Sequence, residues 1–199
     1  MKKLLLILSI IISTSTAFAQ TNLYHSFPDS NVVWNFNLQH YCFSIGGANE
    51  DYSITITGDT MISNQTYQKV ETPYVQSNVS GNCNVYTSGY KGAIREDIGA
   101  KKVYFMPPNQ NVEELLYDFS LQVGDSLKGY LEGGQNPTIV AIDSVLVGNS
   151  YRKRWMIDTN KFYPTYIIEG IGSTFGLLHQ ITLKIANFPN YRLNCFQHG

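Results

Sequence analysis

The chain has 199 residues, with 14 Lys and Arg residues against 15 Asp and Glu residues, so its formal net charge is −1. This balance provides no concentrated positive face, which argues against nucleic acid or an anionic membrane surface as the partner. The length is sufficient for one domain with a substantial hydrophobic core.

The first residues have the three parts of a secretory signal peptide. Lys2 and Lys3 form a positive region, residues 4–12 are an unbroken apolar run, and Ala17-Phe18-Ala19 supplies small residues for cleavage. The apolar run is too short to cross a bilayer, which takes about 20 residues. Without Lys2 and Lys3 the mature chain carries 12 basic and 15 acidic residues, a net charge of −3.

These features predict an exported protein that is periplasmic, at the cell surface or secreted. No second long apolar stretch follows the first. We therefore expect no transmembrane segment in the mature chain. The expected division is a signal peptide at 1–19 and a single all-β domain at 20–199.

Short runs of alternating apolar and polar residues follow, separated by Gly, Asn, Asp and Ser, a pattern typical of consecutive antiparallel strands. The predicted strands lie near Val32–Leu38, Tyr41–Ile45, Tyr52–Thr57, Gln65–Glu71, Val85–Tyr90, Gly92–Glu96, Lys102–Met106, Leu115–Phe119, Ser126–Leu131, Thr138–Val147, Tyr151–Asp158, Thr165–Glu169, Leu177–Lys184 and Arg192–Phe196. The predicted turns are Thr57-Gly58-Asp59-Thr60, Ser63-Asn64-Gln65, Ile98-Gly99-Ala100 and the two-residue turn Gly148-Asn149. The fold class is all-β, an antiparallel meander forming a sandwich or barrel of roughly 10–14 strands.

Three cysteines, Cys42, Cys83 and Cys195, follow the signal peptide. In an oxidising compartment two of them can pair, which leaves the third unpaired. Their spacings match no zinc or redox signature. One disulfide of unassigned connectivity and three small buried side chains are both compatible with the sequence.

The glycine-rich segment 169–176, EGIGSTFG, is the nearest approach to a catalytic or phosphate-binding motif. Its spacing is one residue longer than the dinucleotide fingerprint, and no Lys follows as a P-loop requires. Ser173 directly follows Gly172, so the segment is not a nucleophile elbow either. We predict that Gly170, Gly172 and Gly176 form a structural turn, tied down by Glu169 and Ser173, and we expect no cofactor.

The polar residues suggest no metal site and no catalytic set. The four histidines are far apart and lack metal-ligand spacing. Asp118, Asp125 and Glu169 lie in otherwise apolar segments and are the candidates for a hydrolase, which would need two carboxylates about 5 to 10 Å apart in a cleft. Structural ion pairs are the interpretation that we prefer for Asp118 and Glu169, and Asp125 has the context of a turn-former that accepts from backbone N–H groups.

Tyr151 and Trp155 are the candidate binding residues. They share one face of the predicted strand at 151–158 and could stack on sugar rings if exposed, although most aromatic residues in such a chain fill the core. The neighbouring Arg152-Lys153-Arg154 is divided between the two strand faces, so no nucleic-acid site is expected.

Four motifs together carry a resemblance to a known family: GDTMISNQTYQKV, YKGAIRED…KKVYF, ELLYDFSLQVGDSL and IIEGIGSTFGLL. Their order and spacing, from about Tyr52 to Phe196, resemble an uncharacterised secreted module of the Bacteroidetes that usually precedes a type IX secretion C-terminal sorting domain. Cys195-Phe196 matches the short segment that ends the module. No sorting domain follows before Gly199, which leaves periplasmic retention, another export route and a truncated gene open. The resemblance implies location and fold, and no activity.

The sequence favours an exported, non-enzymatic binding or structural accessory module of the bacterial cell envelope, whose partner is a glycan or another envelope protein. The alternatives are a secreted glycan-acting hydrolase and a calycin-like carrier of a small ligand. Converging carboxylates in a cleft would favour the hydrolase, and an apolar cavity of several hundred Å3 would favour the carrier. A filled core with exposed aromatic residues would favour binding.

Overall fold

A computed structural model describes residues 23–43, 46–78, 83, 85–134, 136–158, 164–181 and 189–199. The predicted signal peptide lies outside the described residues. The predicted all-β class is confirmed: the described chain forms twelve strands in two antiparallel sheets, with one turn of 3₁₀ helix at Tyr130–Glu132.

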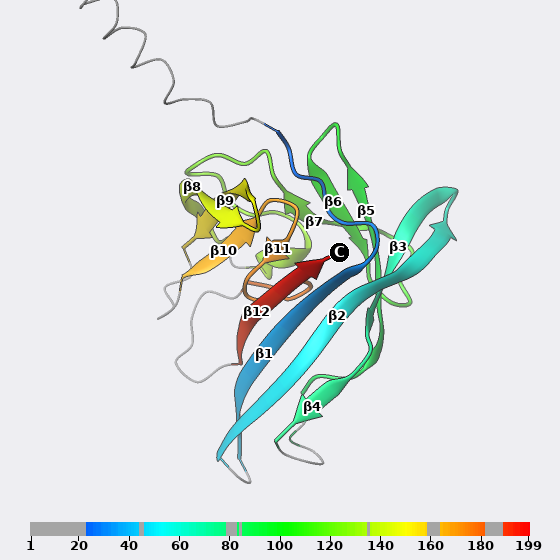
Figure 1. The fold of residues 1–199 in the computed structure, drawn as a ribbon, viewed down its shortest axis with the longest axis vertical. Helices are drawn as coiled ribbons and strands as arrows, with labels where there is room; N and C mark the ends of the chain where they lie inside the picture. Colours follow the sequence, from blue (N-terminus) through cyan, green and yellow to red (C-terminus); the bar gives the residue numbers. More distant parts are fainter. Residues whose placement is uncertain are drawn as a thin grey trace, which may run out of the picture.

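The large sheet has the strand order β12-β1-β2-β3-β5-β6-β7, and the short β4 also pairs with β2 (Figure 1). Its strands are β1 (Val32–Cys42), β2 (Gly46–Ile62), β3 (Gln65–Thr72), β4 (Val75–Ser77), β5 (Gly89–Asp97), β6 (Lys102–Met106), β7 (Glu114–Asp118) and β12 (Asn190–His198). The small sheet has the order β11-β10-β9-β8. Its strands are β8 (Ile139–Val147), β9 (Ser150–Ile157), β10 (Thr165–Ile168) and β11 (Gly172–Ser173).

Strand β1 illustrates why the sequence forms this sheet. Val32, Trp34, Phe36 and Leu38 alternate with more polar residues, and all four are buried. Because successive side chains of a strand point to opposite faces, this alternation directs one face of β1 to the core and the other to solvent. The large sheet curls around its apolar face, and the small sheet lies against one side of it (Figure 1).

One hydrophobic core joins the two sheets. Its members from the large sheet include Trp34, Phe36, Leu38, Tyr52, Ile54, Ile94, Phe105, Leu116 and Tyr117, and those from the small sheet include Ile139, Trp155, Ile157 and Ile167. The chain before β1 adds Phe27, whose ring stacks on both Trp34 and Tyr117 at centroid distances of 5.8 and 5.7 Å.

Residues 169–181, which we call the core-filling segment, occupy the space between the sheets. Ile171, Leu177 and Ile181 are buried there. The indole Nε1 of Trp34 donates a hydrogen bond to Ile171 O at 2.9 Å, and the Tyr117 hydroxyl donates to Leu177 O. The segment therefore fills the interior that a small-ligand carrier of the calycin type would keep open.

The predicted glycine turn lies within this segment. Gly170, Gly172 and Gly176 have φ angles of +66°, +99° and +116°, which side-chain-bearing residues rarely adopt. A Cβ on Gly172 would lie 2.7 Å from the Tyr117 hydroxyl, so the turn needs glycine for space as well as for conformation. Ser173 Oγ accepts a hydrogen bond from Phe175 N at 3.1 Å and helps to fix the turn.

Three predicted turns match the structure closely. Residues 98–100 lie in the turn between β5 and β6, where Lys101 N donates to Ile98 O at 3.3 Å. Gly148 has a φ of +59° between the paired residues Val147 and Ser150, so β8 and β9 form a two-residue hairpin. Ser63 and Asn64 both have positive φ and close the hairpin of β2 and β3.

The turn predicted at 57–60 is wrong, because β2 runs on through it. The register between β2 and β3 shifts between Ile56 and Asp59, and Gly58 has a φ of +129°. The glycine thus makes a bulge, which bends a strand without ending it.

Two of the predicted strands are wrong. At 126–131 only Ser126 makes an isolated bridge, to Thr138, and the 3₁₀ turn follows, because Gly129 adopts a φ of +79° against the Leu115 carbonyl. Residues 177–181 are irregular and bury their apolar side chains as part of the core-filling segment, whereas 182–184 lie outside the described residues.

Further differences concern strand ends. The separate strand predicted at 41–45 is the end of β1 as far as Cys42, and 44–45 are outside the described residues. The two strands predicted at 85–90 and 92–96 form a single strand, β5, which begins only at Gly89. The short strands β4 and β11 were not predicted, because three and two residues are too few to show a pattern.

Candidate binding site

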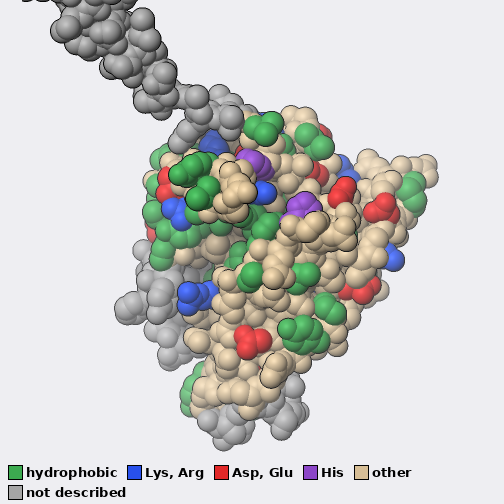
Figure 2. Space-filling view, viewed as in Figure 1, with side chains coloured by type: hydrophobic (Ala, Val, Ile, Leu, Met, Phe, Trp, Pro, Cys, Tyr) green, Lys and Arg blue, Asp and Glu red, His purple; other side chains and the backbone are tan. Residues whose placement is uncertain are grey.

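The outer face of the large sheet carries an array of amide side chains, which we call the amide platform. In the sheet register Gln39 lies beside Asn190 on one side and Asn49 on the other. One step along, Asn37 lies between Arg192 and Asp51. The platform comprises Asn35, Asn37 and Gln39 of β1, Asn49 and Asp51 of β2, Gln76 of β4, Asn78, and Asn190 of β12. Figure 2 shows the surface over β12, β1 and β2 mainly in the colour of uncharged polar side chains and backbone.

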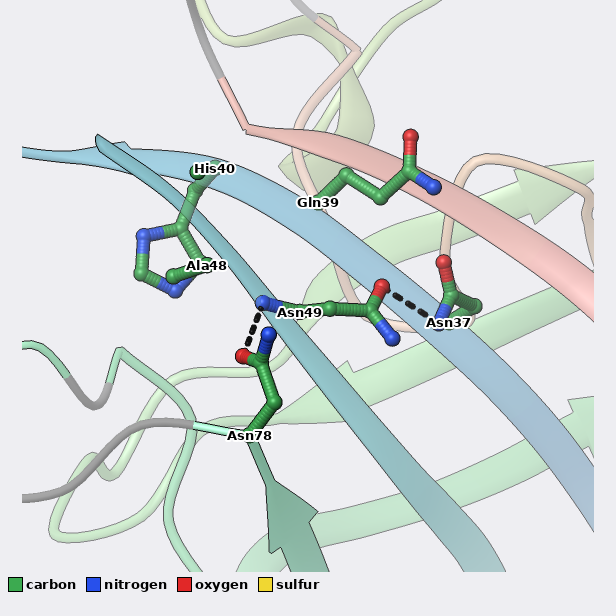
Figure 3. A pocket seen from close by; sticks show the side chains of 7 residues that line it. Asn37, Gln39, His40, Ala48, Asn49 and Asn78 are labelled. Atoms are coloured by element: carbon green, nitrogen blue, oxygen red, sulfur yellow. Dashed lines mark hydrogen bonds between the residues drawn. The ribbon is translucent and has the colours of Figure 1, made fainter. Parts of the chain in front are cut away.

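Part of the platform is hollowed into a surface pocket of about 420 Å3 (Figure 3). The amide Nδ2 of Asn37 donates to Asn49 Oδ1 at 2.9 Å and to Asp51 Oδ1 at 2.7 Å. Asn78 Oδ1 accepts from the backbone N of Asn49 at 2.7 Å, which closes one side of the pocket. Among the described residues, no hydrogen bond engages the side-chain amide of Gln39 or the Nδ2 of Asn49.

A buried carboxylate braces the sheet behind the pocket. Glu50 has no exposed surface, and its carboxylate accepts hydrogen bonds from Val85 N at 2.7 Å and Tyr86 N at 2.8 Å. His40 Nε2 lies 2.9 Å from Glu50 Oε1, and the imidazole of His40 lines the pocket. Because a buried charge needs such partners, these contacts fix the chain at 85–86 against β2.

A disulfide closes the same end of the β1–β2 hairpin. The structure pairs Cys42 with Cys83, with their Cα atoms 5.7 Å apart, and leaves Cys195 free and exposed on β12. Of the arrangements that the sequence left open, this one links the end of β1 to the segment that Glu50 holds. The pocket therefore lies on covalently braced backbone.

Two exposed aromatic rings follow the platform along β1. Tyr41 is 59% exposed and Phe43 is 96% exposed, and their rings meet edge to face at 5.5 Å. Tyr41 shares the outward face of β1 with Gln39, because the two positions differ by two residues. Gly47 is paired with Tyr41 on β2, and a Cβ on Gly47 would meet nothing within 4 Å. Among the described residues, nothing therefore fills the space beside the Tyr41 ring on the Gly47 side.

This arrangement suits a ligand with many hydroxyl groups. A side-chain amide presents two donors and an acceptor, and adjacent strands place such groups about 4.8 Å apart. Tyr41 adds an apolar surface beside these groups, and Asp51 and Arg192 add one charge of each sign at the side. Among the described side chains of the platform, none is a nucleophile with an adjacent base.

The structure separates the two aromatic residues predicted to bind. Tyr151 is 63% exposed on β9, but Trp155 is only 1% exposed and its Nε1 donates to Leu121 O at 2.9 Å. The interpretation of Trp155 as a surface-stacking residue is therefore wrong. The face of β9 that carries both residues is exposed at Tyr151 and buried in the core at Trp155.

The three candidate carboxylates do not form one site. Asp118 and Asp125 line a second pocket, whereas the buried Glu169 begins the core-filling segment. Asp118 Oδ1 accepts from Ser120 N at 2.9 Å, and its Oδ2 lies 3.5 Å from Lys102 Nζ. Asp125 Oδ2 accepts from Gln122 N at 2.8 Å, as expected for a turn-former. Both carboxylates therefore hold backbone turns.

Sequence reasoning missed the platform, although its signal is present. Asn35, Asn37, Gln39 and Tyr41 alternate with buried apolar residues along β1. The alternation predicts a strand, but it does not by itself indicate that the polar side chains of that strand form a binding surface. The contribution of Asn190 depends on pairing between the two ends of the chain, for which the sequence carries no local signal.

In the part of the chain that the structure describes, no helix has the length and apolar character needed to cross a membrane. The same residues contain no cluster of three His, Cys, Asp or Glu side chains suited to a metal ion. No family model, curated protein or solved structure matches this chain. The resemblance to the secreted module therefore stays a prediction.

Proposed function

We propose that this chain is a non-enzymatic, exported binding module of a bacterial cell envelope, and that it binds a glycan on the amide platform. The observation that carries the proposal is the combination of uncommitted amide groups with the exposed ring of Tyr41 on one braced sheet face. Sugars present hydroxyl groups to amides and C–H faces to aromatic rings. The signal peptide predicted at 1–19 supports export.

The alternatives receive less support from the geometry. The candidate carboxylates of the hydrolase are divided between a pocket and the core, and the two in the pocket serve as turn acceptors. The interior in which a calycin-like carrier would hold its ligand contains the core-filling segment.

A glycan array with residues 20–199, scored for both binding and cleavage, tests the proposal. We expect binding to a defined set of glycans and no shortening of any of them. Cleavage would favour the hydrolase, and an array without any bound glycan would contradict the proposal.

Two matched variants locate the site. Tyr41→Ala removes the exposed ring beside the platform and should weaken binding at least about tenfold, the usual effect of removing an aromatic anchor. Tyr151→Ala removes a ring of similar exposure from the other sheet and should leave the affinity unchanged. Gln39→Ala should also weaken binding. The reverse result for the two tyrosines would place the site on β9 instead.

A further inference from the structure

A second pocket lies beside β7, away from the amide platform. It has a volume of about 440 Å3, which falls within the range of small-ligand sites. Its apolar lining includes Leu116, Leu127, Leu131 and Ile167, all of which are at most 4% exposed. The pocket therefore offers a preformed apolar floor at the junction of the large and small sheets.

Strand β7 forms one wall of this pocket. It is the last strand of the large sheet, and among the described strands it pairs with β6 alone. Leu115, Leu116, Tyr117 and Asp118 of β7 all line the pocket. The opposite wall is the chain at 121–131, which approaches β7 so closely at Gly129 that a Cβ there would collide with the Leu115 carbonyl. The two walls are thus fixed in position by backbone contact.

Charges of both signs stand around the apolar floor. Lys102 and Asp118 form one ion pair at 3.5 Å, so their charges are already matched. Lys128 and Asp125 also line the pocket, and both are exposed. Among the described residues neither forms an ion pair, and Asp125 uses only Oδ2, for Gln122 N. One ammonium group and one carboxylate oxygen therefore remain available.

We propose that this pocket binds a short apolar peptide of two or three residues in its zwitterionic form. The ligand carboxylate would contact Lys128, its ammonium group would contact Asp125, and its apolar side chains would lie on the leucine floor. Charge complementarity favours a zwitterion. A ligand with only a negative charge would be repelled by Asp125, and a ligand with only a positive charge would be repelled by Lys128.

Isothermal titration calorimetry with leucyl-leucine tests the proposal on residues 20–199. We expect saturable binding, which is lost when both ends of the ligand are blocked, as in N-acetyl-leucyl-leucine amide. The same heat for the blocked peptide would overturn the proposal, and so would the absence of saturable heat up to the solubility limit of leucyl-leucine.

Two variants assign the charges. Lys128→Gln should weaken binding at least about tenfold, because it removes a charge-assisted contact. Asp125→Asn should have a similar effect on affinity while its amide oxygen still accepts from Gln122 N, so the turn is kept. Lys69→Gln on β3, outside the lining of the pocket, is the matched control and should change nothing. Unchanged affinity in both pocket variants would overturn the proposal.

Discussion

At the scale of single residues, the glycines of the core-filling segment are positions where a side chain cannot be added without strain. Gly172 combines a φ of +99° with a close approach to Tyr117, whose hydroxyl also accepts from Ser173 N at 3.1 Å. Burial raises the pKa of Tyr117 above its usual value, so this hydroxyl stays protonated and keeps donating to Leu177 O. A side chain at 172 would displace that hydroxyl.

Gly172→Ala should therefore lower the free energy of unfolding by about 3 kcal/mol or more, from backbone strain and overpacking together. Gly148→Ala is the control, because Gly148 has a φ of +59° but open space around its Cβ position. It should lose only about 1 kcal/mol. Urea unfolding measures both. Equal losses would show that the contact with Tyr117 is not what requires glycine.

His179 makes the stability of the folded protein depend on pH. Burial, with the Lys91 charge as a smaller cause, lowers the pKa of His179 from 6.5 to about 3. The imidazole Nδ1 is buried without a hydrogen-bond partner, and the ring lies 3.7 Å from that of Tyr191. The folded state therefore resists protonation at a pH where the unfolded chain accepts it.

The folded-state pKa of His179 is depressed, so the unfolded chain binds a proton at a higher pH than the folded chain does. The contribution of neutral His179 to the free energy of unfolding is therefore fully present above pH 6.5 and is lost as the pH falls towards 3. Between pH 7.5 and 5 the free energy of unfolding should drop by about 2 kcal/mol from His179 alone. His179→Phe keeps an aromatic ring and should remove that part of the drop. Urea unfolding of both proteins at the two pH values is the measurement, and identical drops would contradict the assignment.

At the scale of elements, the long β1–β2 hairpin depends on its covalent brace. The bond between Cys42 and Cys83 closes a loop with a sequence separation of 41 residues. In the chain-entropy description, a loop of this length stabilises the fold by about 4 kcal/mol. Glu50 adds the hydrogen bonds that hold Val85 and Tyr86 to the same hairpin.

Replacing both Cys42 and Cys83 with Ser should therefore lower the free energy of unfolding by about 4 kcal/mol. Cys195→Ser should be neutral, because Cys195 is exposed and unpaired in the described structure. Mass spectrometry without reductant first identifies the bonded pair. A bond that includes Cys195 would contradict the structure directly.

The elements also show what could be predicted from the sequence. β1, β6 and β9 can be predicted from the sequence, because each places apolar side chains on alternate positions against the core. Residues 177–181 gave the same apolar signal but serve as irregular filling, since burial alone does not require a strand. The register that places Asn190 beside Gln39 arises from tertiary pairing and could not be predicted.

At the scale of the whole molecule, the two sheets share one core and should unfold together. Trp34 lies in the large sheet and Trp155 in the small sheet, and both are at most 1% exposed. Trp34→Phe and Trp155→Phe each leave one fluorescent reporter, one for each sheet. Within either variant, fluorescence and far-ultraviolet circular dichroism should give the same urea midpoint. Separate midpoints would indicate two units instead of the single domain predicted.

The pairing of β1 with β12 affects the rate and the order in which this chain folds. Val32 lies beside His198, and Gly199 N donates to Asn31 O at 3.2 Å, so the first strand obtains its outer neighbour only from the last residues of the chain. Contacts of such wide sequence separation slow folding, because a large loop must close before they form. A chain emerging from the ribosome would keep β1 without this neighbour until residues 190–198 have also emerged. For the exported protein that we propose, such a delay is compatible with crossing a membrane channel before folding.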